Sequence, residues 1–259
     1  MSAGSPRNPQ RFSNLVARWC GLALFLALWE TSTRLGWFSS TYLSPPSVVF
    51  QALVSLLWRG ELGRHFLISL RRVLIGLSLS VVVGVTFGLF IGYFKTVERY
   101  LDLLFQAFRQ MSAFALFPVF ILLFGLGELS KALIIFWASL WPVLLNTCDG
   151  VKHIDKVLIQ SAQSMGASRT FIFGRIILPA VAPEIFTGIR LGGSYCVMAV
   201  VAAEMIGASS GLGYLIMYSQ ETFNIAEMYA GIISLAILGM GLNFVLRTAG
   251  NFFSAWKEE

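Results

Sequence analysis

The stretch from residue 73 to residue 94 contains no charged side chain and consists almost entirely of apolar and small residues. It is longer than the ~20 apolar residues that an α-helix needs to cross the hydrocarbon core of a bilayer. A single apolar segment inside lipid must satisfy its own backbone groups, which a helix does. The chain is therefore predicted to be an integral membrane protein.

Composition supports this interpretation. Only 12% of the residues are charged, whereas a soluble domain usually carries about 25%. The net charge is +6, but the basic residues lie between apolar segments, as they do in cytoplasmic loops. This pattern predicts contact with membrane lipid and no nucleic-acid partner. The three cysteines, Cys20, Cys148 and Cys196, are far apart, so they predict neither a metal site nor a disulfide framework.

Five further apolar segments bring the predicted number of membrane-spanning helices to six, in an all-α fold. They cover residues 15–33, 111–126, 132–147, 185–206 and 228–246. With the N-terminus inside the cell, most of the 19 basic residues also lie inside. The expected organisation is a cytoplasmic tail (1–14), one membrane domain (15–247) and a second cytoplasmic tail (248–259).

Small residues recur at every fourth position of the segment 73–94. They are Gly76, Ser80, Gly84, Gly88 and Gly92. Gly188 and Gly192 repeat the spacing in the segment 185–206. Small residues at this spacing allow helices to approach closely in lipid, either within one subunit or between two subunits.

The longest predicted cytoplasmic loop, 150–183, has the pattern of two short helices. Asp155 can cap the first helix, which Gly166 can end in a left-handed turn. Ser168 can cap the second helix, and Pro179 is expected to stop it. A structured loop of this kind indicates a function beyond connecting two spans.

The loop also resembles a known motif. Gln160-Ser161-Ala162-Gln163-Ser164-Met165-Gly166, then nine residues, then Ile176-Ile177-Leu178-Pro179, is similar to the EAA loop of ABC importer permeases. That motif has a glutamate and two alanines, a glycine four positions after the second alanine, and the I-x-L-P end. Here Gln160 replaces the glutamate and Ser161 replaces the first alanine.

Other segments resemble the permeases of the nitrate, sulfonate and taurine group. They are residues 201–215, 124–131 and 43–47. The resemblance implies a permease subunit in the bacterial inner membrane that moves a small solute by alternating access. It also implies a second permease copy, two copies of a cytoplasmic ATP-binding subunit and an external solute-binding protein. ATP and magnesium are then expected on the partner ATPase, with no cofactor on this chain, which has no G-x-x-x-x-G-K-[ST] loop of its own.

The resemblance assigns the ATPase-coupling role to the first short helix of the loop and its surroundings. The residues expected to form this coupling loop are Leu158, Gln160, Ser161, Ala162, Met165, Gly166, Ile176, Leu178 and Pro179. Leu158, Ala162 and Met165 are expected to make the apolar contacts that seat the helix on the ATPase.

Four residues are candidates for the translocation path: Met111, Ser112, Pro118 and Glu204. Ser112 can bond either a passing solute or its own helix. An ionisable residue such as Glu204 near a membrane boundary suggests function, and a structural hydrogen bond at the interface is the alternative. Neither 114–124 nor 191–203 contains Lys or Arg. This absence predicts a weakly selective path in which an external binding protein chooses the solute.

Two other classes of protein fit parts of the pattern. A secondary transporter would need ionisable residues in the middle of the membrane, and the central stretches lack them apart from Glu204. An intramembrane serine hydrolase could use Ser209, because residues 207–211 read G-x-S-x-G and His65 is predicted to lie on the same side. That motif requires a strand–turn–helix, whereas this segment follows a predicted membrane helix.

Overall fold

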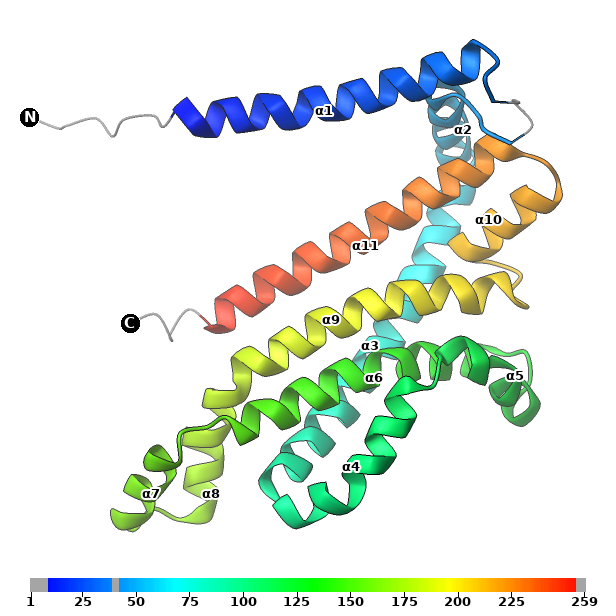
Figure 1. Ribbon diagram of the computed structural model, residues 1–259. Helices are drawn as coiled ribbons and strands as arrows, with labels where there is room; N and C mark the ends of the chain where they lie inside the picture. The colour runs from blue at the N-terminus through cyan, green and yellow to red at the C-terminus, as the bar shows by residue number, and fades with distance from the viewer. Residues whose placement is uncertain (1–8, 39–41, 255–259) are drawn as a thin grey trace, which may run out of the picture.

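The computed structural model describes residues 9–38 and 42–254, which form α-helices joined by short turns (Figure 1). The helices are α1 (Pro9–Arg34), α2 (Pro46–Trp58), α3 (Glu61–Tyr93), α4 (Lys95–Gln110), α5 (Ala113–Phe124), α6 (Glu128–Lys152), α7 (Lys156–Ser164), α8 (Arg169–Ile172), α9 (Leu178–Met205), α10 (Leu212–Glu221) and α11 (Ile225–Ser254). A π-helical turn, Phe173–Ile177, joins α8 to α9.

Four continuous helical segments are long and apolar enough to cross a membrane: Glu61–Tyr93, Glu128–Lys152, Arg169–Met205 and Ile225–Asn251. A fifth is added if the bent pair α4–α5 counts as one span. The predicted first span, 15–33, lies in α1, which is not among these segments. The all-α membrane fold is confirmed, and the number of six spans stays a prediction.

The third predicted span, 111–126, is not one straight helix. The chain is extended at Met111 and Ser112, and the helices on either side of this break meet at 93°. Helix α5 has only 12 residues, which at 1.5 Å per residue gives about 18 Å, against about 30 Å of hydrocarbon. If the bent pair forms one span, the rest of the crossing comes from α4, which carries Lys95, Glu98, Arg99, Asp102 and Arg109. Hydropathy alone does not identify such a helix as part of a span.

The small residues of α3 allow it to pack closely on α6. A Cβ atom on Gly88 would lie 2.7 Å from the backbone oxygen of Leu144, and one on Gly92 would lie 2.9 Å from that of Cys148. Ser139 of α6 donates a hydrogen bond to Ser80 at 2.8 Å. Gly188 of α9 approaches α6 in the same way, since a Cβ atom there would lie 3.0 Å from the Pro142 backbone oxygen. These small residues therefore pack within one subunit.

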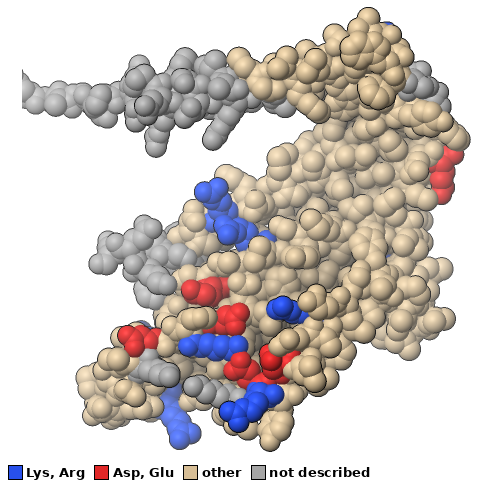
Figure 2. All heavy atoms as spheres, viewed as in Figure 1, with Lys and Arg blue, Asp and Glu red and all other residues tan. Residues whose placement is uncertain are grey.

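The two ends of the molecule differ. Helices α7 and α8 project beyond the ends of α6 and α9, and α1 begins and α11 ends toward the same end (Figure 1). The connections around α2 and α10 lie at the opposite end (Figure 1). On the face in Figure 2, most charged side chains gather toward the α7–α8 end, and a broad band of uncharged surface lies beyond them. This distribution suits a protein whose middle is surrounded by lipid.

Candidate functional site

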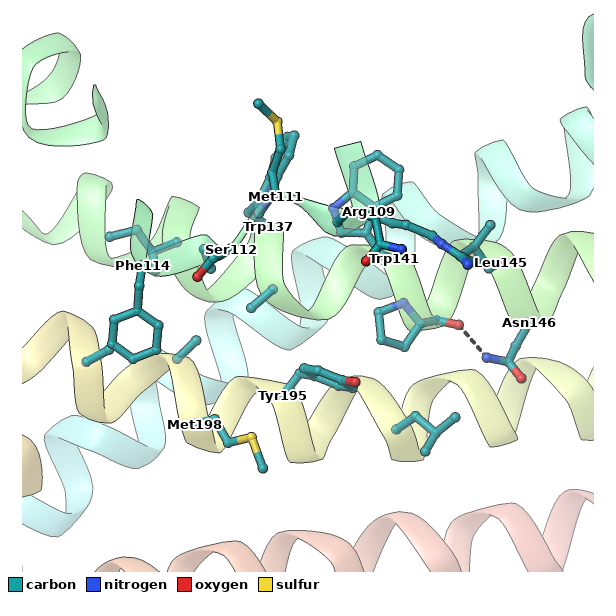
Figure 3. A pocket seen from close by; sticks show the side chains of 18 of the residues that line it. Arg109, Met111, Ser112, Phe114, Trp137, Trp141, Leu145, Asn146, Tyr195 and Met198 are labelled. Atoms are coloured by element: carbon teal, nitrogen blue, oxygen red, sulfur yellow. Dashed lines mark hydrogen bonds between the residues drawn. The ribbon is translucent and has the colours of Figure 1, made fainter. Parts of the chain in front are cut away.

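A cavity of about 720 Å³ lies between the α4–α5 break, the middle of α6 and the middle of α9. Arg109, Met111 and Ser112 border it from the break, and Tyr195 and Met198 face it from α9 (Figure 3). The predicted path residues Met111 and Ser112 therefore line a real cavity. Its volume is within the usual range for sites that bind small molecules, about 300–1,000 Å³.

Aromatic side chains form one wall of the cavity. Trp137 and Trp141 of α6 lie with their ring centroids 5.3 Å apart. Phe108, on the last turn of α4, contacts both rings at centroid distances of 5.9 and 6.2 Å. Tyr195 adds an aromatic ring from α9. These contacts fix the end of α4 against the centre of α6.

The polar groups of the cavity differ in how they are satisfied. The Asn146 amide donates to the Pro142 backbone oxygen at 2.8 Å, and the Asp149 carboxylate accepts from Lys152 at 3.2 Å. The structure assigns no hydrogen bond or ion pair between the Arg109 or Ser112 side chain and any other described residue. The Ser112 hydroxyl therefore does not bond its own helix. The Ser112 hydroxyl and the Arg109 guanidinium are both available to a solute in the cavity.

The other two path candidates lie elsewhere. Pro118 is inside α5 and is not among the cavity-lining residues. Glu204 is also outside the cavity, and only 1% of it is exposed. It sits at the end of α9 opposite α7–α8.

Glu204 is the centre of a buried polar network. Its carboxylate accepts from Arg72 Nη1 at 2.8 Å, from Ser69 Oγ at 2.8 Å and from the Gly213 backbone N–H at 2.9 Å. Arg72 also donates to both carboxylate oxygens of Glu128, at 2.8 and 2.5 Å, and to the Ser210 backbone oxygen at 2.6 Å. The network therefore ties α3, α6, α9 and the turn before α10 together, which gives Glu204 a structural role.

The predicted caps of the coupling loop are present. The Asp155 side chain accepts from the Val157 N–H at 2.8 Å at the start of α7. Gly166 ends the helix with φ +76°, and the Ala167 N–H reaches back to the Ala162 backbone oxygen at 3.0 Å. This is the Schellman arrangement that needs a left-handed residue. The Ser168 side chain then accepts from the Phe171 N–H at 3.3 Å.

The residues of the coupling loop fall into an inner and an outer set. Ala162 is 4% exposed and packs with Leu89, Ile172 and Val181 in a small core of its own. It therefore faces the body of this chain and does not make the partner contact expected of it. Leu158 and Met165 are 53% and 80% exposed. Gln160, Ser161 and Leu178 are also exposed, and Ile176 and Pro179 are half-buried.

Pro179 does not stop the second short helix. The chain continues from α8 through the π-helical turn into α9, so residues 169–205 form one long helical segment. The Leu178 N–H donates to the Phe173 backbone oxygen, five residues earlier. Pro179 then falls in the first turn of α9, and the wider turn accommodates a residue that lacks the N–H of an ordinary helix.

Ser209 and His65, the residues of the hydrolase hypothesis, do not form a catalytic pair in the structure. His65 Nδ1 accepts a hydrogen bond from the Gly211 N–H at 3.0 Å, and its ring contacts Tyr214. No hydrogen bond joins Ser209 to His65 in the described part of the chain. Residues 207–211 form a turn between α9 and α10 and lack the strand that the motif requires.

The sequence of this chain is similar to those of known transport proteins. The family model described as "binding-protein-dependent transport system inner membrane component" matches residues 84–257. The taurine transport system permease protein TauC of Escherichia coli (strain K12) is 34% identical over 243 residues, which cover 92% of this chain and 88% of TauC. The putative aliphatic sulfonates transport permease protein SsuC of Bacillus subtilis (strain 168) is 33% identical, with 91% and 85% covered.

A solved structure shares the fold. A chain of the MetNI methionine ABC transporter, in an inward facing conformation, aligns with a TM-score of 0.60 and 17% identity, over 71% of this chain and 92% of that chain. The EAA-like loop, the multi-pass helical fold and the near full-length similarity agree. The chain therefore belongs to the family of inner-membrane components of binding-protein-dependent transport systems, the permease subunits of ABC transporters.

Proposed function

We propose that this permease imports a small sulfonate-type solute, such as taurine or a short alkanesulfonate, across the bacterial inner membrane. The observation that carries the proposal is the similarity over nine tenths of the chain to permeases named for taurine and aliphatic sulfonates. Membership of the family implies an ATPase and a solute-binding protein as partners. In our proposal the chain binds no cofactor and catalyses no reaction, because ATP and magnesium are on the partner ATPase.

Two copies of the permease form the path in this proposal. The cavity supports a dimer because it is open on one side of the single chain. Met111, Phe114 and Met198 line the cavity and are 47%, 54% and 66% exposed. Large apolar side chains that border a polar solute path need cover from protein, and a second copy facing the first would close the cavity.

The proposed orientation places α7 and α8 in the cytoplasm. Both termini would lie on that side, since α1 begins and α11 ends toward the α7–α8 end. The residues 1–14 and 248–259 are then cytoplasmic tails on the single membrane domain 15–247. The excess of Lys and Arg in the segments of this side favours the same orientation.

The coupling contact is proposed for the outer face of α7. Leu158 and Met165 present exposed apolar surface beyond the ends of α6 and α9. Val157 of α7 and Phe171 of α8 are also exposed, at 62% and 54%, and exposed apolar side chains that gather at a polar end of a protein suit a contact with another protein. Gln160 and Ser161 flank this surface, and Gly166, Ile176, Leu178 and Pro179 hold the helix in place relative to α9. Each of two ATPase copies would receive one α7.

ATP-driven uptake tests the proposal. The permease, its ATPase and its binding protein are reconstituted in liposomes, with uptake of labelled taurine, ethanesulfonate and nitrate measured with and without internal ATP. We expect ATP-dependent uptake of the two organic sulfonates, and a complex mass that contains two permeases and two ATPases. Uptake of nitrate alone would contradict the substrate class, and a fully active complex with one permease would contradict the dimer.

A further inference from the structure

We propose that Arg109 is the residue of the translocation path that contacts the negatively charged group of the solute. The inference rests on the proposed import function and adds to it the residue that binds the negatively charged group of the solute. The solute class is a small organic anion with a compact oxyanion group, such as a sulfonate, and a short organic part.

Arg109 lies beside the middle of α6, and its side chain extends toward Leu145, on the α7–α8 side of that midpoint (Figure 3). Its neighbour Phe108 packs on Trp137 and Trp141, which are on either side of the midpoint of α6, a helix of 25 residues. At 1.5 Å per residue, these tryptophans are about 14 and 20 Å from the start of α6. The hydrocarbon core is about 30 Å thick. The end of α4 therefore carries a cation into the half of the apolar region toward α7–α8, alongside the part of α6, residues 132–147, that carries no charge.

The charge of Arg109 is not neutralised within the described chain. Asp149 is the acidic residue that also borders the cavity, and its carboxylate accepts from Lys152. Lys152 also pairs with Glu98, so these three side chains together carry one net negative charge, but no ion pair joins Asp149 to Arg109 among the described residues. A charged side chain at this depth is costly and usually faces a cavity or a partner. Because Arg109 faces the cavity and has no protein partner there, an anionic solute would supply the missing opposite charge.

The surroundings of Arg109 favour an organic anion. A guanidinium group presents paired N–H donors that match the oxygens of an oxyanion. The first turn of α5 also borders the cavity, from Ser112 to Phe114, and the N-terminal end of a helix adds positive potential. The rings of Trp137, Trp141 and Tyr195 offer apolar surface for a short carbon chain. An inorganic anion such as nitrate would leave that surface unused.

The test compares variants of the complete transporter in liposomes. Arg109→Gln removes the charge, and Arg109→Lys keeps it. Arg99→Gln is the matched control, because Arg99 is on the same helix, is also exposed, and lies about 15 Å along α4 outside this cavity. ATP-driven uptake of ethanesulfonate is measured together with co-purification of the ATPase and basal ATP hydrolysis.

We expect Arg109→Gln to lower ethanesulfonate uptake by about tenfold or more, since a bond to a charged group is lost. Arg109→Lys keeps the charge but not the paired donors, so its uptake should lie between that of Arg109→Gln and that of the wild type. Arg99→Gln should stay within about twofold of the wild type, with assembly and basal hydrolysis retained in all three variants. Wild-type uptake by Arg109→Gln would overturn the inference. So would an equal loss in the assembled Arg109→Lys variant, because the positive charge that lysine keeps would then contribute nothing to uptake.

A second measurement needs no variant. Phenylglyoxal modifies accessible arginines, and peptide mass spectrometry follows each site in the wild-type complex. Ethanesulfonate is expected to slow modification of Arg109 and to leave Arg99 unchanged. If the wild type imports ethanesulfonate but Arg109 is modified at equal rates with and without it, the inference about Arg109 is wrong and the proposed import function stands. If the wild type imports neither ethanesulfonate nor taurine, the proposed substrate class and this inference both fail.

Discussion

Replacing Gly166 with proline is expected to abolish ATP-driven transport while the permease still enters the membrane. Gly166 adopts φ +76°, whereas proline is held near −65° and has no N–H to donate. The hydrogen bond from the Gly166 N–H to the Gln163 backbone oxygen would be lost. The turn after α7 would then change direction, and Leu158 and Met165 would no longer be presented as one surface. Uptake and co-purification of the ATPase should both fall to background.

Gly166→Asn provides the matched control. A Cβ atom at this position would have no other atom within 4 Å, so the backbone angle alone decides the effect. Asparagine tolerates the left-handed conformation better than other residues with a side chain. The asparagine variant should therefore keep most of the transport activity. Normal transport by Gly166→Pro would show that the shape of this turn is not needed for coupling.

The second large effect is expected from the buried network around Glu204. Glu204→Ala would leave the Arg72 guanidinium, whose side chain is only 6% exposed, without its buried partner. Breaking a buried ion pair in this way costs about 3–5 kcal/mol. The melting temperature of the detergent-solubilised permease should fall by about 10 °C or more, as measured by size-exclusion chromatography after heating.

Two variants define the limits of that prediction. Arg71→Ala changes the neighbouring residue, which is exposed, and should leave the melting temperature almost unchanged. Glu128→Ala removes the partner whose side chain is 66% exposed, so its effect should be intermediate. If Glu204→Ala melts at the wild-type temperature, the network does not hold α3, α6 and α9 together as described. A loss of transport without loss of stability would instead point to a role of Glu204 in the path.

The features that the sequence predicts well are local ones. The capping residues Asp155 and Ser168 and the left-handed Gly166 depend on a few neighbouring residues, so their types and spacing are sufficient to predict α7 and its turn. The charge-free segment 73–94 is also sufficient by itself to predict a membrane-spanning helix. The helix in the structure starts earlier, at Glu61. Its first turns contain polar residues, so the apolar stretch 73–94 does not include them.

The features that the sequence does not predict depend on packing between distant elements. Helix α4 is strongly amphipathic and charged, so hydropathy assigns it to a loop, and Arg109 with it. Only the contacts of Phe108 with Trp137 and Trp141 place that end of α4 at the centre of α6. The absence of a cation from the apolar segments is a correct observation, but it does not describe the whole cavity, because Arg109 of α4 also borders it. The weakly selective path stays a prediction. The available signal is the apolar face of residues 95–110, which includes Phe105 and Phe108, both in contact with Trp141.

Pro179 and Ala162 illustrate the same limit. A proline usually ends a helix, but a π-helical turn before it allows α8 and α9 to continue as one segment. Ala162 has the helical spacing of Leu158, yet it faces a core formed by residues from α3, α8 and α9. Which side of a short helix faces its own protein depends on these distant residues, and the spacing within the helix does not contain that information.

Site-directed cross-linking is the most direct test of the central claim that the outer face of α7 receives the ATPase. Met165→Cys, at a position 80% exposed, is made in a chain whose exposed Cys20 is replaced by serine; Cys148 and Cys196 are buried. Trp58→Cys, 87% exposed on α2 at the other end of the molecule, is the control. We predict cross-linking of the assembled ATPase to residue 165 and none to residue 58. Cross-linking to residue 58 with none to residue 165, in an active complex, would contradict the account.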